Sequence, residues 1–131
     1  MTEGKRPSGE PAIRTVPMPA DTNPNGDIFG GWLMARMDTA GAVAAVRRSR
    51  GRVATVAVTG MSFHKPVLVG DIVSCYAEIQ KIGRTSMTVT VETWIDRHNG
   101  DSYKVTEGTF VYVALDDQGR PRAVDSSISS K

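Results

Sequence analysis

The sequence predicts a single α+β domain in which one long helix lies across one face of an antiparallel sheet. Two observations support this class: a long helical segment occurs early in the chain, and about four long strand segments follow it with only short turns between them. Helical crossovers, which a parallel sheet would need, are missing from that second part. With 131 residues the chain is long enough for one hydrophobic core and too short for two ordinary domains.

The helix is predicted over Gly31–Arg48. This stretch is rich in Ala, Leu and Met, contains no proline, and is bounded by Gly30-Gly31 before it and Gly51 after it. A group of arginines surrounds its end: Arg47, Arg48, Arg50 and Arg52. Cations at this position offset the helix macrodipole before a glycine stop, and binding of a ligand's phosphates is the alternative interpretation.

The strands are predicted from alternation and from turn residues. The segment 53–63 is apolar on both alternating faces, which favours a strand in the middle of a covered sheet. The next two segments alternate, so that each is expected to bury one face. The predicted strands are 13–16, 53–63, 73–80, 87–95 and 103–115, with turns at 82–84 and 98–101.

Composition limits the class of function. Apolar residues make up 40% of the chain, charged residues 23%, and the formal net charge of +2 is too small to indicate a nucleic-acid partner. No apolar run reaches the length of a membrane span, and the first residues do not resemble a secretory signal, so we expect a cytoplasmic protein. We predict flexible ends at 1–12 and 125–131 around a domain at 13–124. Cys75 has no disulfide partner and falls in an alternating apolar pattern, which indicates a buried, unreactive thiol.

Asp38 is the residue of greatest chemical interest. It is the only charged residue between Met37 and Val46, and its neighbours on the same helix face cannot pair with it. An isolated carboxylate on an apolar face is typical of a general base or nucleophile, although an aspartate that simply points into water is the alternative. Free backbone N–H groups at Gly30-Gly31 would hold a developing oxyanion at the start of the same helix.

Four blocks of sequence carry a family resemblance. They are 21–41, 51–58, 63–71 and 83–89, and they include the Asn-Gly-Asp-Ile-Phe-Gly-Gly-Trp run, the Met-Asp pair in the helix and a Lys-Pro block that ends in Gly-Asp. In order and spacing these blocks resemble the YciA-type acyl-CoA thioesterases of the hotdog superfamily. The similarity extends over most of 13–124.

The resemblance implies a long central helix wrapped by a curved antiparallel β-sheet, the hotdog fold. It implies protomers that pair into a continuous sheet and share active sites, with a trimer of dimers as the next level of assembly. Asp38 matches the family's catalytic aspartate, and Gly31, with Gly30, matches the turn whose backbone polarises the thioester carbonyl. Asn23, Asn25 and Asp27 lie in a loop that lines the site in relatives. Asn25 and Asp27 are the favoured participants, with a role as turn residues equally open.

Coenzyme A carries phosphates, so its site needs cations at the mouth. The turn formed by Arg84, Thr85 and Ser86 offers a guanidinium and two hydroxyls, and Lys65 before Pro66 is the second candidate. Each of these residues would otherwise be an ordinary surface residue. His64 stands where relatives are expected to carry an apolar residue. A loop histidine is the favoured interpretation, and a contact with the ligand is the alternative.

The predicted function is hydrolysis of acyl-CoA to a free acid and CoA, with acyl-CoA the only small-molecule partner. Asp38 would act as general base or nucleophile and the Gly31 backbone as oxyanion hole. The alternative is a non-catalytic sensor that binds acyl-CoA. His64 and His98 are far apart and no metal-binding or Gly-x-Ser-x-Gly motif is present, so neither a metal, a further cofactor nor a serine triad is expected. A hotdog dehydratase ranks lower, because neither histidine lies in the helix that carries Asp38.

Overall fold

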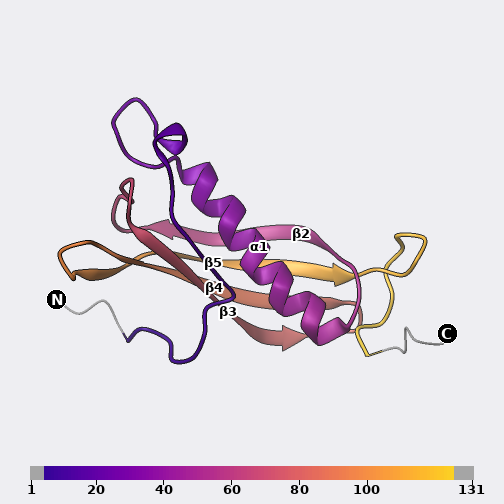
Figure 1. The fold of residues 1–131 in the computed structure, drawn as a ribbon. Coiled ribbons are helices and arrows are strands. Elements are labelled where there is room, and N and C mark those ends of the chain that lie inside the picture. The colour runs from indigo at the N-terminus through magenta and orange to yellow at the C-terminus, as the bar shows by residue number, and fades with distance from the viewer. Residues whose placement is uncertain (1–4, 126–131) are drawn as a thin grey trace.

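The computed structural model describes residues 5–125 and contains one long helix and one five-stranded sheet. The helix, α1, spans Gly30–Ser49 and lies diagonally across one face of the sheet (Figure 1). The strands are β1 (Ile13–Thr15), β2 (Val53–Phe63), β3 (Ile72–Ile82), β4 (Ser86–Asp96) and β5 (Ser102–Ala114), and a short 3-10 turn covers Pro19–Asp21. The predicted α+β class is confirmed, and α1 is one residue longer at each end than the predicted helix.

The strand order is β1-β3-β4-β5-β2, and every neighbouring pair is antiparallel. β3, β4 and β5 follow one another through the two predicted turns, of which the second contains Gly100 with a φ of 95°. β2 pairs only with β5 among the described strands and therefore forms an edge. Within a single chain, therefore, the prediction that it lies in the middle of a covered sheet is wrong: Val56 and Val58 are 57% and 38% exposed.

The core lies between α1 and the inner face of the sheet. Leu33, Met37, Ala40 and Ala45 of α1 are buried against alternate residues of the strands. The strand residues of this core include Val73, Cys75, Met87, Val89, Val91, Ile95, Val105, Phe110 and Tyr112. Cys75 is fully buried, as predicted. Packing against this core fixes which face of α1 is turned toward the sheet.

The helix ends differ from the prediction in one respect. The residue in the left-handed conformation is Arg50, with a φ of 61°, and its N–H donates to the Val46 carbonyl at 2.7 Å. The sequence predicts a glycine stop at Gly51, but the left-handed residue that ends the helix is Arg50, one position before that glycine. Arg47 and Arg48 occupy the last turn, where their charge offsets the helix dipole.

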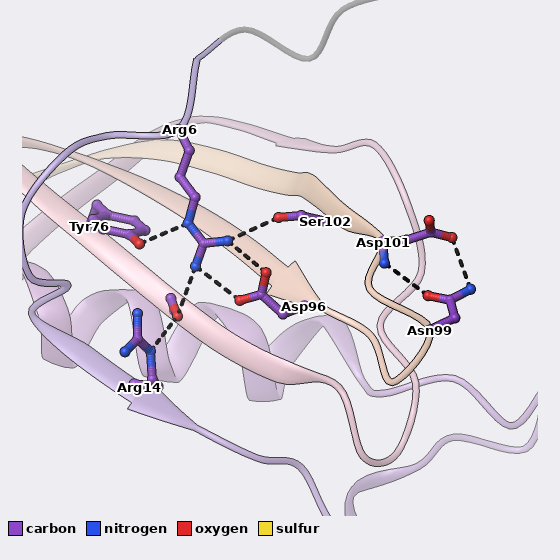
Figure 2. Close-up of polar contacts among 8 residues, drawn as sticks. Arg6, Arg14, Tyr76, Asp96, Asn99, Asp101 and Ser102 are labelled. Carbon is purple, nitrogen blue, oxygen red and sulfur yellow. Dashed lines mark hydrogen bonds and ion pairs between the residues drawn. The ribbon is translucent and has the colours of Figure 1, made fainter.

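The outer face of the sheet is partly covered by the segment before β1. Ser74 and Tyr76 of β3 point away from the core, since they alternate with Val73 and Cys75, yet both are buried. Arg6 lies over them and donates hydrogen bonds to Tyr76, Asp96, Ser102 and Ser74 (Figure 2). This anchoring was not expected from the sequence, which predicts a flexible end at 1–12. Residues 1–4 and 126–131 of the two predicted ends lie outside the described residues.

Among residues 5–125, α1 is the only long helix, and it is not apolar enough to cross a membrane.

Candidate functional site

The carboxylate of Asp38 lies half-buried between α1 and the β2–β5 side of the sheet. Two hydroxyl groups donate to the same oxygen, Oδ1: Thr55 Oγ1 from β2 at 2.7 Å and Tyr112 OH from β5 at 3.0 Å. The other carboxylate oxygen of Asp38, Oδ2, accepts no hydrogen bond from any of the described residues. The prediction that neighbours on the helix leave Asp38 unpaired holds, because both partners come from strands. A carboxylate with one oxygen held and the other free has the form that a general base or a nucleophile needs.

Tyr112 is the more deeply placed of the two partners. Its ring is fully buried, and its hydroxyl also donates to the backbone carbonyl of Asp38 at 2.8 Å. Burial, together with the nearby Asp38, raises the pKa of Tyr112 far above its ordinary value of 10.0, so the hydroxyl stays protonated and remains a donor.

Sequence reasoning missed Thr55 and Tyr112. The signal available for Thr55 was a lone hydroxyl within the apolar run 53–58, and for Tyr112 a polar tip in the apolar strand segment 110–114. Neither signal shows that the residue contacts Asp38, because these contacts join residues far apart in the chain: Tyr112 lies 74 residues from Asp38.

The start of α1 opens onto a cavity of about 380 Å³. Its N-cap, Phe29, supplies no side-chain hydrogen bond, so no side-chain cap occupies the N–H groups of the first turn. Gly30 lines the cavity, and Gly31 is exposed with open space where a Cβ would be. The walls also contain Asn23, Asp27, Ile28, Leu33, Phe63, His64, Lys65, Pro66 and Val67. The cavity therefore combines helix N–H groups, a lysine and apolar walls, which suit a carbonyl or an anion.

The loop before α1 places its polar residues unevenly. Asn23 lines the cavity, and its side-chain oxygen accepts hydrogen bonds from the N–H groups of Asn25 and Asp27. Asn25, one of the favoured candidates, is exposed and does not line the cavity, whereas Asp27 does. Asn23 therefore shapes the loop and also faces the cavity, whereas the sequence predicts Asn25 at that place.

The candidate CoA contacts fall into two separate groups. Lys65 borders the cavity at the start of α1, where its ammonium lies 5.0 Å from the ring centroid of Tyr103. The turn that carries Arg84, Thr85 and Ser86 lies near the other end of the helix, because Arg84 accepts a hydrogen bond from Val124 and the adjacent Arg122 donates to Ser49. A 20-residue helix is about 30 Å long, so one protomer does not bring these two groups together.

Asp38 and the N–H groups at the start of α1 are also far apart within one chain. Asp38 is seven residues beyond Gly31, a rise of about 10 Å along the axis. One carbonyl group cannot lie within hydrogen-bond distance of both in a single copy of the chain.

Comparison of the chain with known proteins shows the family to which it belongs. The model of the thioesterase superfamily matches residues 25–100, the region that holds the loop, α1 and strands β2 to β4. The chain belongs to the thioesterase superfamily. Its curated relatives include an enzyme named acyl-CoA thioester hydrolase YciA from Salmonella typhimurium, 51% identical over 125 residues, which cover 92% of this chain and 94% of the relative.

Solved thioesterase structures show the same architecture. The hexameric thioesterase of Yersinia pestis is 52% identical with a TM-score of 0.87, and the match covers 92% of this chain and all of the other. A hexameric hotdog-fold thioesterase of Campylobacter jejuni is 38% identical with a TM-score of 0.86, covering 92% and 94% of the two chains. The expected hotdog fold is therefore confirmed, together with the family resemblance read from the four sequence blocks.

Proposed function

We propose that this member of the thioesterase superfamily hydrolyses acyl-CoA to a free carboxylic acid and CoA, with Asp38 as its catalytic carboxylate. The observation that carries the proposal is the arrangement at Asp38. Thr55 and Tyr112 donate hydrogen bonds to Oδ1, whereas Oδ2 accepts no hydrogen bond from residues 5–125. Support for the substrate class comes from the Salmonella relative, which is named for acyl-CoA thioester hydrolysis.

Asp38 acts in one of two ways. As a general base, it takes a proton from water while the water oxygen bonds to the thioester carbonyl carbon. As a nucleophile, its oxygen bonds to that carbon, CoA leaves as a thiolate, and water then cleaves the resulting anhydride. In both routes the N–H groups of Gly31 and Gly30 stabilise the oxyanion, and the leaving thiolate takes up a proton from solvent.

The site is built from two copies of the chain. Asp38 accepts a hydrogen bond from Thr55 of the edge strand β2, so it lies beside the surface that a second copy would cover. Pairing of two β2 strands about a twofold axis sets the two α1 helices antiparallel and brings the start of one helix toward the middle of the other. Asp38 of one protomer then works with Gly31 of its partner, which removes the separation of about 10 Å along the helix of a single chain.

The same pairing explains the two groups of cationic residues. Lys65 lies beside the start of α1 in one protomer, and Arg84 lies near the end of α1 in the other. Both contribute to one CoA site, with Thr85 and Ser86 as hydroxyl donors to phosphate. Within the cavity, Asn23 and Asp27 shape the loop around the thioester. No metal or further cofactor takes part in the proposed reaction, and CoA enters only as part of the substrate.

The test compares wild type with Asp38→Asn and Asp38→Ala in a thiol-release assay on a panel of acyl-CoA thioesters. We expect kcat/KM to fall by at least about 100-fold in both variants, since the reacting carboxylate is lost. Asp117→Asn, an exposed aspartate in the loop after β5, serves as the matched control and should leave kcat/KM unchanged. Wild-type activity in both Asp38 variants would disprove the catalytic assignment. CoA binding by wild type without any turnover would favour the sensor.

Heavy-oxygen water separates the two routes. Under single-turnover conditions, label that enters the Asp38 carboxylate supports the anhydride, and an unlabelled Asp38 supports the general base.

A further inference from the structure

Tyr112 makes a contact with Asp38 that a residue serving only the core would not need. Its hydroxyl lies between two oxygens of the same residue, the backbone carbonyl at 2.8 Å and Oδ1 of the carboxylate at 3.0 Å. A donor shared between the main chain and the side chain of one residue restricts the side-chain torsions of that residue. The carboxylate is therefore held relative to the helix axis as well as to the sheet.

Gly41 shows that α1 leaves room for this contact. A Cβ built at Gly41 would overlap the Tyr112 hydroxyl oxygen and lie 2.9 Å from two ring carbons, so any side chain there would displace the tyrosine. Glycine is the poorest helix former after proline, yet it occupies the interior of α1 at this point. The group that fills the space beside Gly41 is the Tyr112 side chain.

The rest of the Tyr112 side chain is fixed by the sheet. It lies on β5 opposite Met87 of β4, it is fully buried, and its ring is stacked 6.4 Å from that of Phe110. A group placed by a buried strand is a rigid support, in contrast to a hydroxyl on a loop. Thr55, the second donor to Oδ1, comes from the exposed edge strand β2.

From these contacts we propose that Tyr112 is a positioning residue of the thioesterase reaction, which fixes the Asp38 carboxylate so that Oδ2 is the oxygen that reacts. This inference rests on the proposed function of Asp38. Tyr112 touches neither substrate nor water in the reaction, and it acts only through Asp38. Gly41 is the residue that allows the tyrosine to reach it.

The variant that tests this is Tyr112→Phe, which removes one oxygen atom and keeps the ring. We expect kcat to fall by about 10-fold to 100-fold, because a misdirected reacting group loses alignment, while KM stays within about twofold of wild type. Tyr76→Phe is the matched control, since its hydroxyl accepts a hydrogen bond from Arg6 on the outer face, away from Asp38. That control should leave kcat within about twofold of wild type. Thermal unfolding is measured for each variant, and activity is assayed well below the lowest midpoint.

A double-mutant comparison shows whether Tyr112 acts through Asp38. In an Asp38→Asn background, Tyr112→Phe should cause no further loss of residual kcat, because residues that act as one unit are strongly non-additive. The inference is overturned if Tyr112→Phe keeps kcat within about twofold of wild type, if it raises KM alone, or if its effect is the same in both backgrounds. Failure of the proposed function looks different: Asp38→Asn itself would then keep full activity.

Discussion

Arg6 donates two hydrogen bonds to the carboxylate of Asp96, from Nη1 to Oδ1 at 2.8 Å and from Nη2 to Oδ2 at 3.0 Å, across 90 residues of sequence. The guanidinium also lies 5.6 Å from the ring centroid of Tyr76 and 5.9 Å from that of Trp94. Figure 2 shows the guanidinium enclosed by Tyr76, Asp96 and Ser102, with Arg14 on a neighbouring segment. A bidentate pair with aromatic contacts ties the segment before β1 to the outer face of the sheet.

Arg6→Ala should lower the free energy of unfolding by about 1 kcal/mol, because the pair is geometrically good but partly screened by solvent. The Arg6 and Asp96 side chains are 26% and 38% exposed, which keeps the expected loss this small. Urea denaturation measures it, with Arg120→Ala at an exposed position as the control. Equal midpoints for Arg6→Ala and wild type would show that the contact adds nothing.

The stabilisation from Arg6 should depend on pH. The hydrogen bond from Arg6 holds the pKa of Asp96 below its ordinary value of 3.8. A carboxyl group whose pKa is lower in the folded state stabilises the fold above the unfolded pKa and loses that contribution as the pH falls through the folded pKa. The stability gap between wild type and Arg6→Ala should therefore be constant above about pH 5 and shrink below about pH 4. A gap that widens on acidification would contradict this sign.

Two glycines of α1 should respond oppositely to alanine. Gly31→Ala meets no atom within 4 Å and replaces a poor helix former, so unfolding should cost about 0.5–1 kcal/mol more. Gly41→Ala collides with Tyr112 and should destabilise the protein by about 1–3 kcal/mol despite the better helix propensity. Chemical denaturation of both variants measures the contrast, and a stabilised Gly41→Ala would mean that the tyrosine can move away at little cost.

Cys75 should resist thiol reagents while the protein is folded. Burial raises the pKa of the Cys75 thiol to about 11, so almost no thiolate exists near neutral pH. We expect slow labelling by a chromogenic disulfide at pH 8 in buffer and rapid labelling of one thiol per chain in denaturant. Because the unfolded thiol ionises first as pH rises, stability should also decline above about pH 9. Fast labelling of the folded protein would show that β3 opens locally.

Mixing two inactive variants tests the shared site. Asp38→Ala lacks the carboxylate, and Gly31→Pro lacks one N–H group of the helix start while keeping a backbone suited to the first turn. Refolding the two together should restore about a quarter of wild-type activity, since about half the dimers are mixed and each has one intact site. If Asp38 and Gly31 of the same chain formed the site, mixing would restore nothing.

The elements that sequence predicts well are those with strong local signals. α1 follows from its alanine-rich composition and its glycine boundaries, and β3 to β5 follow from alternation and the turn at Gly100. The resemblance of the four blocks then correctly gave the family and the hotdog fold. These features depend on residues close together in the chain.

What the sequence did not predict depends on distant residues. The apolar pattern of β2 shows that both faces are suited to burial, but it does not show whether a neighbouring strand or another molecule covers them. The partners of Asp38 come from β2 and β5, and the anchor of Arg6 comes from β4. Side-chain contacts across tens of residues leave no periodic trace, so Thr55, Tyr112 and the role of Gly41 emerged only from the structure.

The pairing of β2 with β5 has a consequence for how the protein folds. Val53 lies opposite Ala114, so this ladder closes only after most of the chain has been synthesised. Until then Asp38 has neither Thr55 held in place nor Tyr112 beside it, although α1 can already form. Assembly of the carboxylate's surroundings should thus coincide with the slow, non-local step of folding, and early intermediates with an intact helix should be chemically inert.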